Sequence, residues 1–217
     1  MLIPASLKGL KPGEISLVVL GRVIMGDIAV TLVDLAQRDL LRVEETDDGA
    51  DWLLSPLHRV SAPRGIAEYE IKLLEQLADR GQIVRLSSLA AGFGQDLGKV
   101  RHALEHEVAA QGWVKRLRHD QRTPKGEELV RHVRSFQREL RKFKSDGGEE
   151  TVGGTLLPFA LRFGLVSSDQ LPLARLARDW VRTFADLPGW RPVQPERPVY
   201  DTYGPMFPEA PPGAGMV

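Results

Sequence analysis

Two histidines and a glutamate near the middle of the chain have spacing suited to metal chemistry. His102, Glu105 and His106 match the H-x-x-E-H pattern of inverted zinc peptidases, and histidines four residues apart share one side of a helix. When the side chains are placed around the helix axis at about 100° per residue, however, Leu104 lies on the same apolar side as Val100, and the three polar residues lie on the opposite side. We therefore predict an exposed polar face with no metal, and keep a small metal-dependent enzyme using these three residues as an alternative.

A glycine-rich stretch, 92–99, superficially resembles a phosphate-binding loop. Its third glycine comes one residue late for the dinucleotide pattern, and a predicted helix, not a strand, precedes it. Val100 follows Lys99 where a Walker motif has Ser or Thr. The chain also has no cysteine and no G-x-S-x-G sequence. These residues predict no catalytic set and no cofactor, so we expect that the protein is not an enzyme.

A strong local excess of positive charge lies within a chain that is neutral overall. The 217 residues carry 29 Lys+Arg and 29 Asp+Glu, yet eleven of the cations and only four of the acids lie between 115 and 144. Such a surface is a solvated face, or it attracts an acidic protein, nucleic-acid phosphates or anionic lipids. The candidate partner- or anion-binding residues are Lys115, Arg116, Arg118, Arg122, Arg131, Arg134, Arg138, Arg141 and Lys142.

The elements that carry these residues are predicted as two similar units. In the unit 9–60, a short helix from Pro12 and a helix capped by Asp27 precede two strands around the hairpin signal Asp48-Gly49. In the unit 66–123, helix 68–80 precedes strand 82–86, a short helix capped by Ser87, helix 95–111 and a second ribbon. This order is typical of a winged helix-turn-helix.

The remaining chain is predicted as a basic amphipathic helix over 124–145, a helical segment over 154–190 and a Pro-rich extended tail over 191–217. The fold class is therefore mainly α with small β-ribbons (α+β), with tandem winged-helix-like units. The longest run without a charge, 151–161, is far shorter than the ~20 residues of a membrane span. The N-terminus lacks the pattern of a signal peptide, and the absence of cysteine fits a cytoplasmic location.

Several motifs occur in the order found in one bacterial family. They are IVRLSSLAAGFGQDLGKVRHALEHEVAAQGWV at 83–114, LPFALRFG at 157–164 and WVRTF at 180–184, with a weaker pattern from Thr31 to Val43. Together they resemble the cytoplasmic part of YciQ-type predicted membrane proteins, a family of unknown function. Phe159 replaces the usual tyrosine, and the family's membrane spans are missing from this sequence. The resemblance implies a tandem winged-helix fold with an interaction role near membranes, and it implies no catalytic residues.

The function predicted from these features is that of a non-catalytic interaction, adaptor or regulatory protein. We expect a protein partner or a homodimer as its main contact, with nucleic acid or the surface of an anionic membrane as further possibilities. The main alternative is a DNA-binding regulator that uses the helix and wing over 99–122, although the acids of that helix oppose phosphate binding.

Overall fold

The computed structural model describes residues 3–57, 65–116, 118–146, 154–166, 171–188 and 190. Residues 147–153, between the predicted helical segments 124–145 and 154–190, and the whole Pro-rich tail, 191–217, lie outside the described residues. The described chain is mainly helical with two small antiparallel sheets, which confirms the α+β class. Within it, no helix has the length and apolar character needed to cross a membrane.

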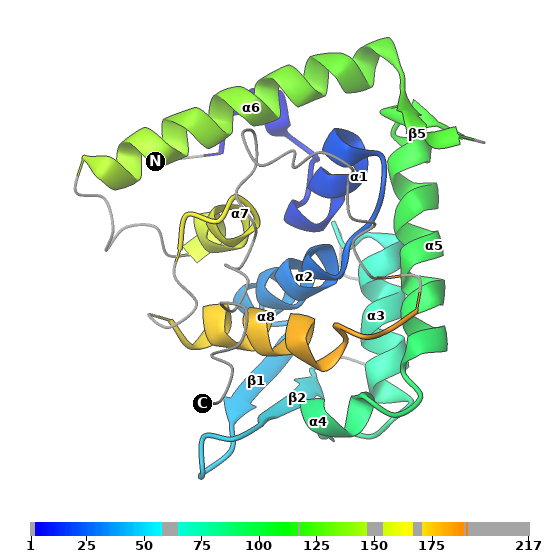
Figure 1. Cartoon of the computed structure of the whole chain (residues 1–217), viewed down its shortest axis with the longest axis vertical. Coiled ribbons are helices and arrows are strands. Elements are labelled where there is room, and N and C mark those ends of the chain that lie inside the picture. Colours follow the sequence, from blue (N-terminus) through cyan, green and yellow to red (C-terminus); the bar gives the residue numbers. More distant parts are fainter. Residues whose placement is uncertain are drawn as a thin grey trace, which may run out of the picture.

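Helix α2 (Met25–Gln37) lies at the centre of the molecule (Figure 1). Ten of its thirteen residues are buried, as expected for a helix enclosed on most sides. It packs against η2 (Pro12–Glu14), α7 (Leu157–Arg162) and α8 (Pro172–Thr183). The C-terminal helical segment therefore covers the first predicted unit and completes its core.

A second pair of helices forms one side of the molecule. Helices α3 (Glu68–Ala78) and α5 (Gly94–Ala110) pack side by side, and the short α4 (Leu86–Leu89) lies just before α5 in the chain (Figure 1). Four apolar residues on one side of α3 are all buried: Tyr69, Leu73, Leu74 and Leu77. Gly92, with φ of 96°, supplies the turn between α4 and α5, since a left-handed backbone favours glycine.

The strands connect the two predicted units. In the three-stranded sheet, β1 (Leu41–Glu45) pairs with β2 (Trp52–Pro56), and β2 pairs with β3 (Val84–Arg85). The ribbon predicted as a wing consists of β4 (Val114–Lys115) and β5 (Arg118–Arg122) and forms a separate two-stranded sheet, for which we keep the word wing as a label only. The strand preceding the short helix of the second unit thus pairs with the first unit's hairpin instead of with its own wing.

Helix α6 (Pro124–Ser145) crosses one side of this assembly, above α1 (Ile15–Leu20) and α7 (Figure 1). The apolar stripe of this predicted amphipathic helix comprises Leu129, Val133, Phe136 and Leu140, which are buried, and Phe143, which is partly buried against the core. The Phe136 ring packs edge-on against α7, with its centroid 5.6 Å from that of Phe159. One continuous hydrophobic core joins this helix to α2, α3 and α5.

Two predicted helix caps are wrong. Asp27 lies inside α2 at its third position, where its carboxylate accepts a hydrogen bond from the backbone N–H of Ile24 at 2.8 Å. Ser87 lies inside α4, whose N-cap is Arg85, and its hydroxyl donates to Asp51 at 2.6 Å. The Ser87 side chain is thus fixed by a residue distant in the chain, whereas Asp27 makes the local contact of a capping box, in which the third helical residue accepts from the N-cap N–H.

Candidate functional site

The longest helix holds most of the candidate residues, and its start is tightly specified. Pro124 occupies the first turn, where its missing N–H costs nothing, and the Thr123 hydroxyl caps the helix by accepting from the Gly126 N–H at 3.1 Å. A Cβ on Gly126 would lie 1.9 Å from the carbonyl oxygen of Trp113. This close approach fixes α6 against the start of the wing and therefore orients its outward face.

That outward face carries a stripe of positive side chains. Arg131, Arg134, Arg138, Arg141 and Lys142 are all exposed, as their placement opposite the apolar stripe predicts. The stripe extends over eleven residue steps, which correspond to roughly 16 Å along a helix. The side chains of four of the five form no hydrogen bond or ion pair with any described residue: Arg131, Arg138, Arg141 and Lys142. Their charges are therefore available to an external anionic group.

The wing residues of the predicted site have other contacts. Arg122 donates from Nε to Glu127 at 2.6 Å and from a guanidinium nitrogen to the Val19 carbonyl at 3.0 Å, so it ties the wing to α1. Lys115 donates to the side chain of Gln121 at 3.0 Å, and Arg118 lies 3.6 Å from Asp120. Arg122 therefore has a structural role in the wing, whereas the cations of the α6 stripe are exposed to solvent.

His102 and His106 lie together on an open groove between α3 and α5. The groove, of about 630 Å³, is also lined by Glu68 and Lys72 from α3 and by Lys99 from α5. Glu105, the glutamate of the H-x-x-E-H pattern, is directed to β5, with Oε2 3.8 Å from Nδ1 of His119. Within the described ranges, no three His, Cys, Asp or Glu side chains are arranged so that they could hold a metal ion.

Helix α5 is partly covered on the side of α8. A Cβ on Gly94 would lie 2.6 Å from a methyl carbon of Leu187, and the guanidinium of Arg101 lies 5.3 Å from the ring centroid of Trp190. Just before the helix, the Phe93 ring meets Trp180 of α8 edge-on at 6.1 Å. The chain that follows α8 therefore lies against the helix that would read DNA in a winged helix.

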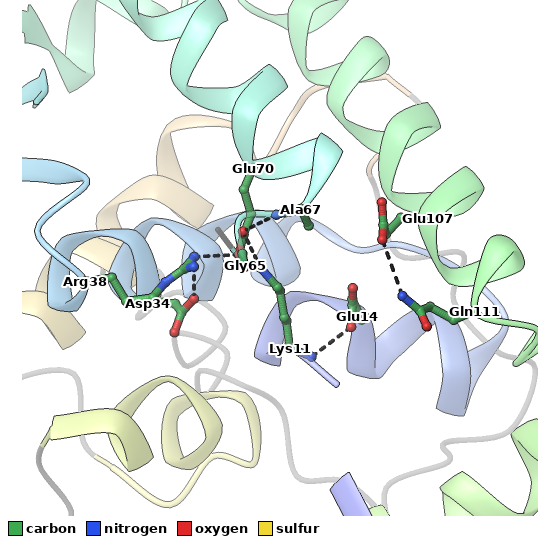
Figure 2. A network of polar contacts seen from close by, with 9 residues as sticks. All are labelled: Lys11, Glu14, Asp34, Arg38, Gly65, Ala67, Glu70, Glu107 and Gln111. Atoms are coloured by element: carbon green, nitrogen blue, oxygen red, sulfur yellow. Dashed lines mark hydrogen bonds and ion pairs between the residues drawn. The ribbon is translucent and has the colours of Figure 1, made fainter. Parts of the chain in front are cut away.

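A buried ionic network joins η2, α2 and α3 (Figure 2). At its centre is Glu70, whose side chain is only 1% exposed. Its carboxylate pairs with the Lys11 ammonium, accepts from Arg38 at 2.6 Å and accepts from the Ala67 backbone N–H at 2.8 Å. Arg38 also pairs with Asp34 at 2.9 Å, so the charges on three separate elements are satisfied together. The network holds the N-terminal segment against the helical core.

Glu14 lies beside this network and is the most strongly perturbed acid that we find. It is 2% exposed, and its carboxylate accepts from the backbone N–H of Lys11 at 2.8 Å. Burial raises its pKa from 4.5 to about 8, with smaller opposing effects from the Lys11 backbone and charge, while the negative charge of Glu70 raises it further. Glu14 is therefore mostly protonated at neutral pH.

A second buried cluster connects α7 to α1 and α2. Arg162 donates from Nε to Asp27 at 3.1 Å and from its terminal nitrogen to the Ser16 hydroxyl, which in turn donates to Asp27. Burial raises the pKa of Asp27 to about 6, although the Arg162 charge lowers it. Asp27 is thus still ionised at neutral pH and forms a complete pair with Arg162 inside the core.

The sequence reasoning did not identify either buried cluster. A signal was present, because Asp27 and Arg162 each interrupt an otherwise apolar stretch, IMGDIAV and LPFALRF. A charged residue within such a stretch indicates a buried pair, since an unpaired charge in a core is costly. Which charge pairs with which depends on contacts between segments more than 100 residues apart.

No protein-family model, curated protein or solved structure matches this chain. The resemblance to the YciQ-type family therefore stays a prediction that rests on the motifs quoted above.

Proposed function

We propose that the protein is a non-catalytic adaptor that binds an acidic surface of a partner protein through the exposed stripe of α6. The observation that carries this proposal is the contrast within one helix. The apolar side of α6 is buried, whereas four cations on its other side have no partner among the described residues. Elsewhere, cations such as Lys11, Arg38 and Arg162 are paired with acids.

The packing of α6 favours a protein partner over a lipid bilayer. An amphipathic helix that binds membranes inserts its apolar face into the interface, whereas here Phe136 and its neighbours on that face are covered by the core. Binding of α6 to a membrane would then depend on charge attraction alone, without insertion of apolar side chains. A preformed helix that presents a row of arginines suits a protein surface, because each guanidinium can form a bidentate, directional pair with a carboxylate.

The winged-helix order of 68–122 supports an interaction module, and we keep the tandem winged-helix description as part of this proposal. A regulator that reads DNA through α5 is less favoured, because Leu187 and Trp190 lie against that helix and Asp96 on it pairs with Arg80 at 2.6 Å. Phosphate contacts dominate DNA affinity, and α5 carries acids as well as cations.

The experiment compares two triple charge reversals in the full chain. Arg131→Glu, Arg138→Glu and Arg141→Glu remove the stripe, whereas Lys72→Glu, Lys99→Glu and Arg182→Glu make the same change on α3, α5 and α8. Co-purification from the native host with mass spectrometry, followed by binding measurements on the partner over a range of salt, is the assay.

We expect the α6 variant, but not the control, to lose an acidic protein partner, with a salt dependence typical of charged contacts. Equal retention by both variants would contradict the proposal. Binding of the unmodified protein to anionic vesicles or to duplex DNA, in place of a protein, would also contradict it.

A further inference from the structure

The outer face of the three-stranded sheet carries exposed apolar side chains among charged ones. Ile83 is 64% exposed and Leu57 is 44% exposed, the two highest values among the large apolar side chains described. Both line one hollow of about 500 Å³, together with Arg42 and Glu44 of β1. Clustered exposed apolar side chains rimmed by charges are typical of protein interfaces.

A second hollow continues this face toward the β1–β2 turn. It has a volume of about 280 Å³ and is lined by Leu53 of β2, Arg85 of β3 and Glu44 of β1. These three residues form one row across the sheet, because Glu44 pairs with Leu53 and Leu53 pairs with Arg85 in the strand register. Residues directly opposite in antiparallel strands share a face, so the row reads acid, leucine, arginine.

We propose that this sheet face is the interface of a homodimer. A two-fold axis parallel to β2 and lying between two stacked sheets exchanges β1 with β3. Each Leu53 then faces its counterpart, and each Glu44 faces Arg85 of the second copy, which gives two equivalent charge pairs. A self-complementary row of this kind is what a two-fold interface requires.

The charges of the row are available for such pairing. Arg85 forms no close ion pair and no side-chain hydrogen bond with any described residue, although its charge acts at longer range on Asp48 and Asp51. Among the described residues, Glu44 is paired only with Arg42 of its own strand, at 2.6 Å, and both side chains are about half exposed or more. Exposed pairs of this type contribute little to the monomer, so exchanging one for an intermolecular pair costs little.

The test is sedimentation velocity on the full chain over a wide concentration range. We expect a monomer–dimer equilibrium, and we expect Leu53→Asp to raise the dimer dissociation constant at least about tenfold, because each Leu53 faces its counterpart on the axis and the substitution places two like charges there. Glu44→Arg and Arg85→Glu should each weaken the dimer, because each places like charges opposite each other.

The double variant, Glu44→Arg with Arg85→Glu, is the decisive measurement, because it restores opposite charges across the axis. We expect its dissociation constant to return to within a few-fold of the original. Arg138→Glu on α6 is the matched control and should leave the dimer unchanged, so loss of the α6 partner and loss of the dimer are separate outcomes. A strictly monomeric protein, or a dimer insensitive to the sheet variants, would overturn the proposal.

Discussion

Replacing Glu14 with glutamine should remove a large part of the pH dependence of stability. The folded protein holds Glu14 protonated up to about pH 8, whereas the unfolded chain releases this proton near the ordinary value of 4.5. An acid whose pKa is raised by folding therefore stabilises the folded state fully at low pH. That stabilisation is lost as the pH rises from 4.5 through 8, because the unfolded state is then favoured by ionisation.

The size of the effect follows from this pKa difference. Each unit of pH within the window changes the free energy of unfolding by about 1.4 kcal/mol, so the full effect is on the order of 5 kcal/mol. Glutamine keeps an acceptor oxygen for the backbone N–H of Lys11 and cannot ionise. We expect similar stabilities of Glu14→Gln and the original protein near pH 5, and a clear advantage for the variant above pH 8.

Urea unfolding, followed by tryptophan fluorescence and far-ultraviolet circular dichroism at a series of pH values, measures this difference. Comparing the two proteins at each pH cancels the contribution of Asp27, whose pKa is raised to about 6 in both. Glu75→Gln is the control, because Glu75 is exposed on α3 and pairs only with Lys72. Stability curves of the original protein and Glu14→Gln that run parallel from pH 5 to 9 would refute the reasoning.

Two further substitutions test the packing that positions α6 and α7. Arg162→Met leaves Asp27 buried without its partner and should cost about 3–5 kcal/mol in the free energy of unfolding, and adding Asp27→Asn should recover part of that loss in a double-mutant cycle. Gly126→Ala should destabilise by about 2 kcal/mol or more, since its Cβ meets the Trp113 carbonyl. By contrast, Gly98→Ala should stabilise the protein by up to about 1 kcal/mol, because a Cβ there meets no other atom. Thermal unfolding measures both glycine variants, and equal effects of the two substitutions would contradict the close contact at Gly126.

The helices were predictable from the sequence because their side chains sort clearly by period. Leu129, Val133 and Phe136 recur on one side of α6, and the burial of that side needs no knowledge of its partner. The exposed arginine stripe follows from the same pattern. The order of helices and ribbons was therefore accessible, and so was the part of the candidate site that lies on α6.

Contacts between distant segments were not predictable in this way. No local pattern shows that β3 pairs with β2, because a strand of two residues carries almost no periodicity. The role of Arg122 was hidden for a similar reason: its charge suggested an anion site, yet it donates to the Val19 carbonyl more than 100 residues away in the chain. Both contacts depend on how distant segments pack in the complete fold, and no local sequence pattern specifies that packing.

Site-specific photo-crosslinking identifies directly what the α6 stripe contacts. A photoreactive phenylalanine analogue at Ser135, between Arg131 and Arg138 on α6, leaves every cation of the stripe in place, and it is compared in native cells with the same analogue at Glu75 on α3. We expect an adduct with an acidic protein from position 135 and none from position 75. Adducts of nucleic acid or lipid at position 135, or the absence of any adduct there, would contradict the proposed adaptor role.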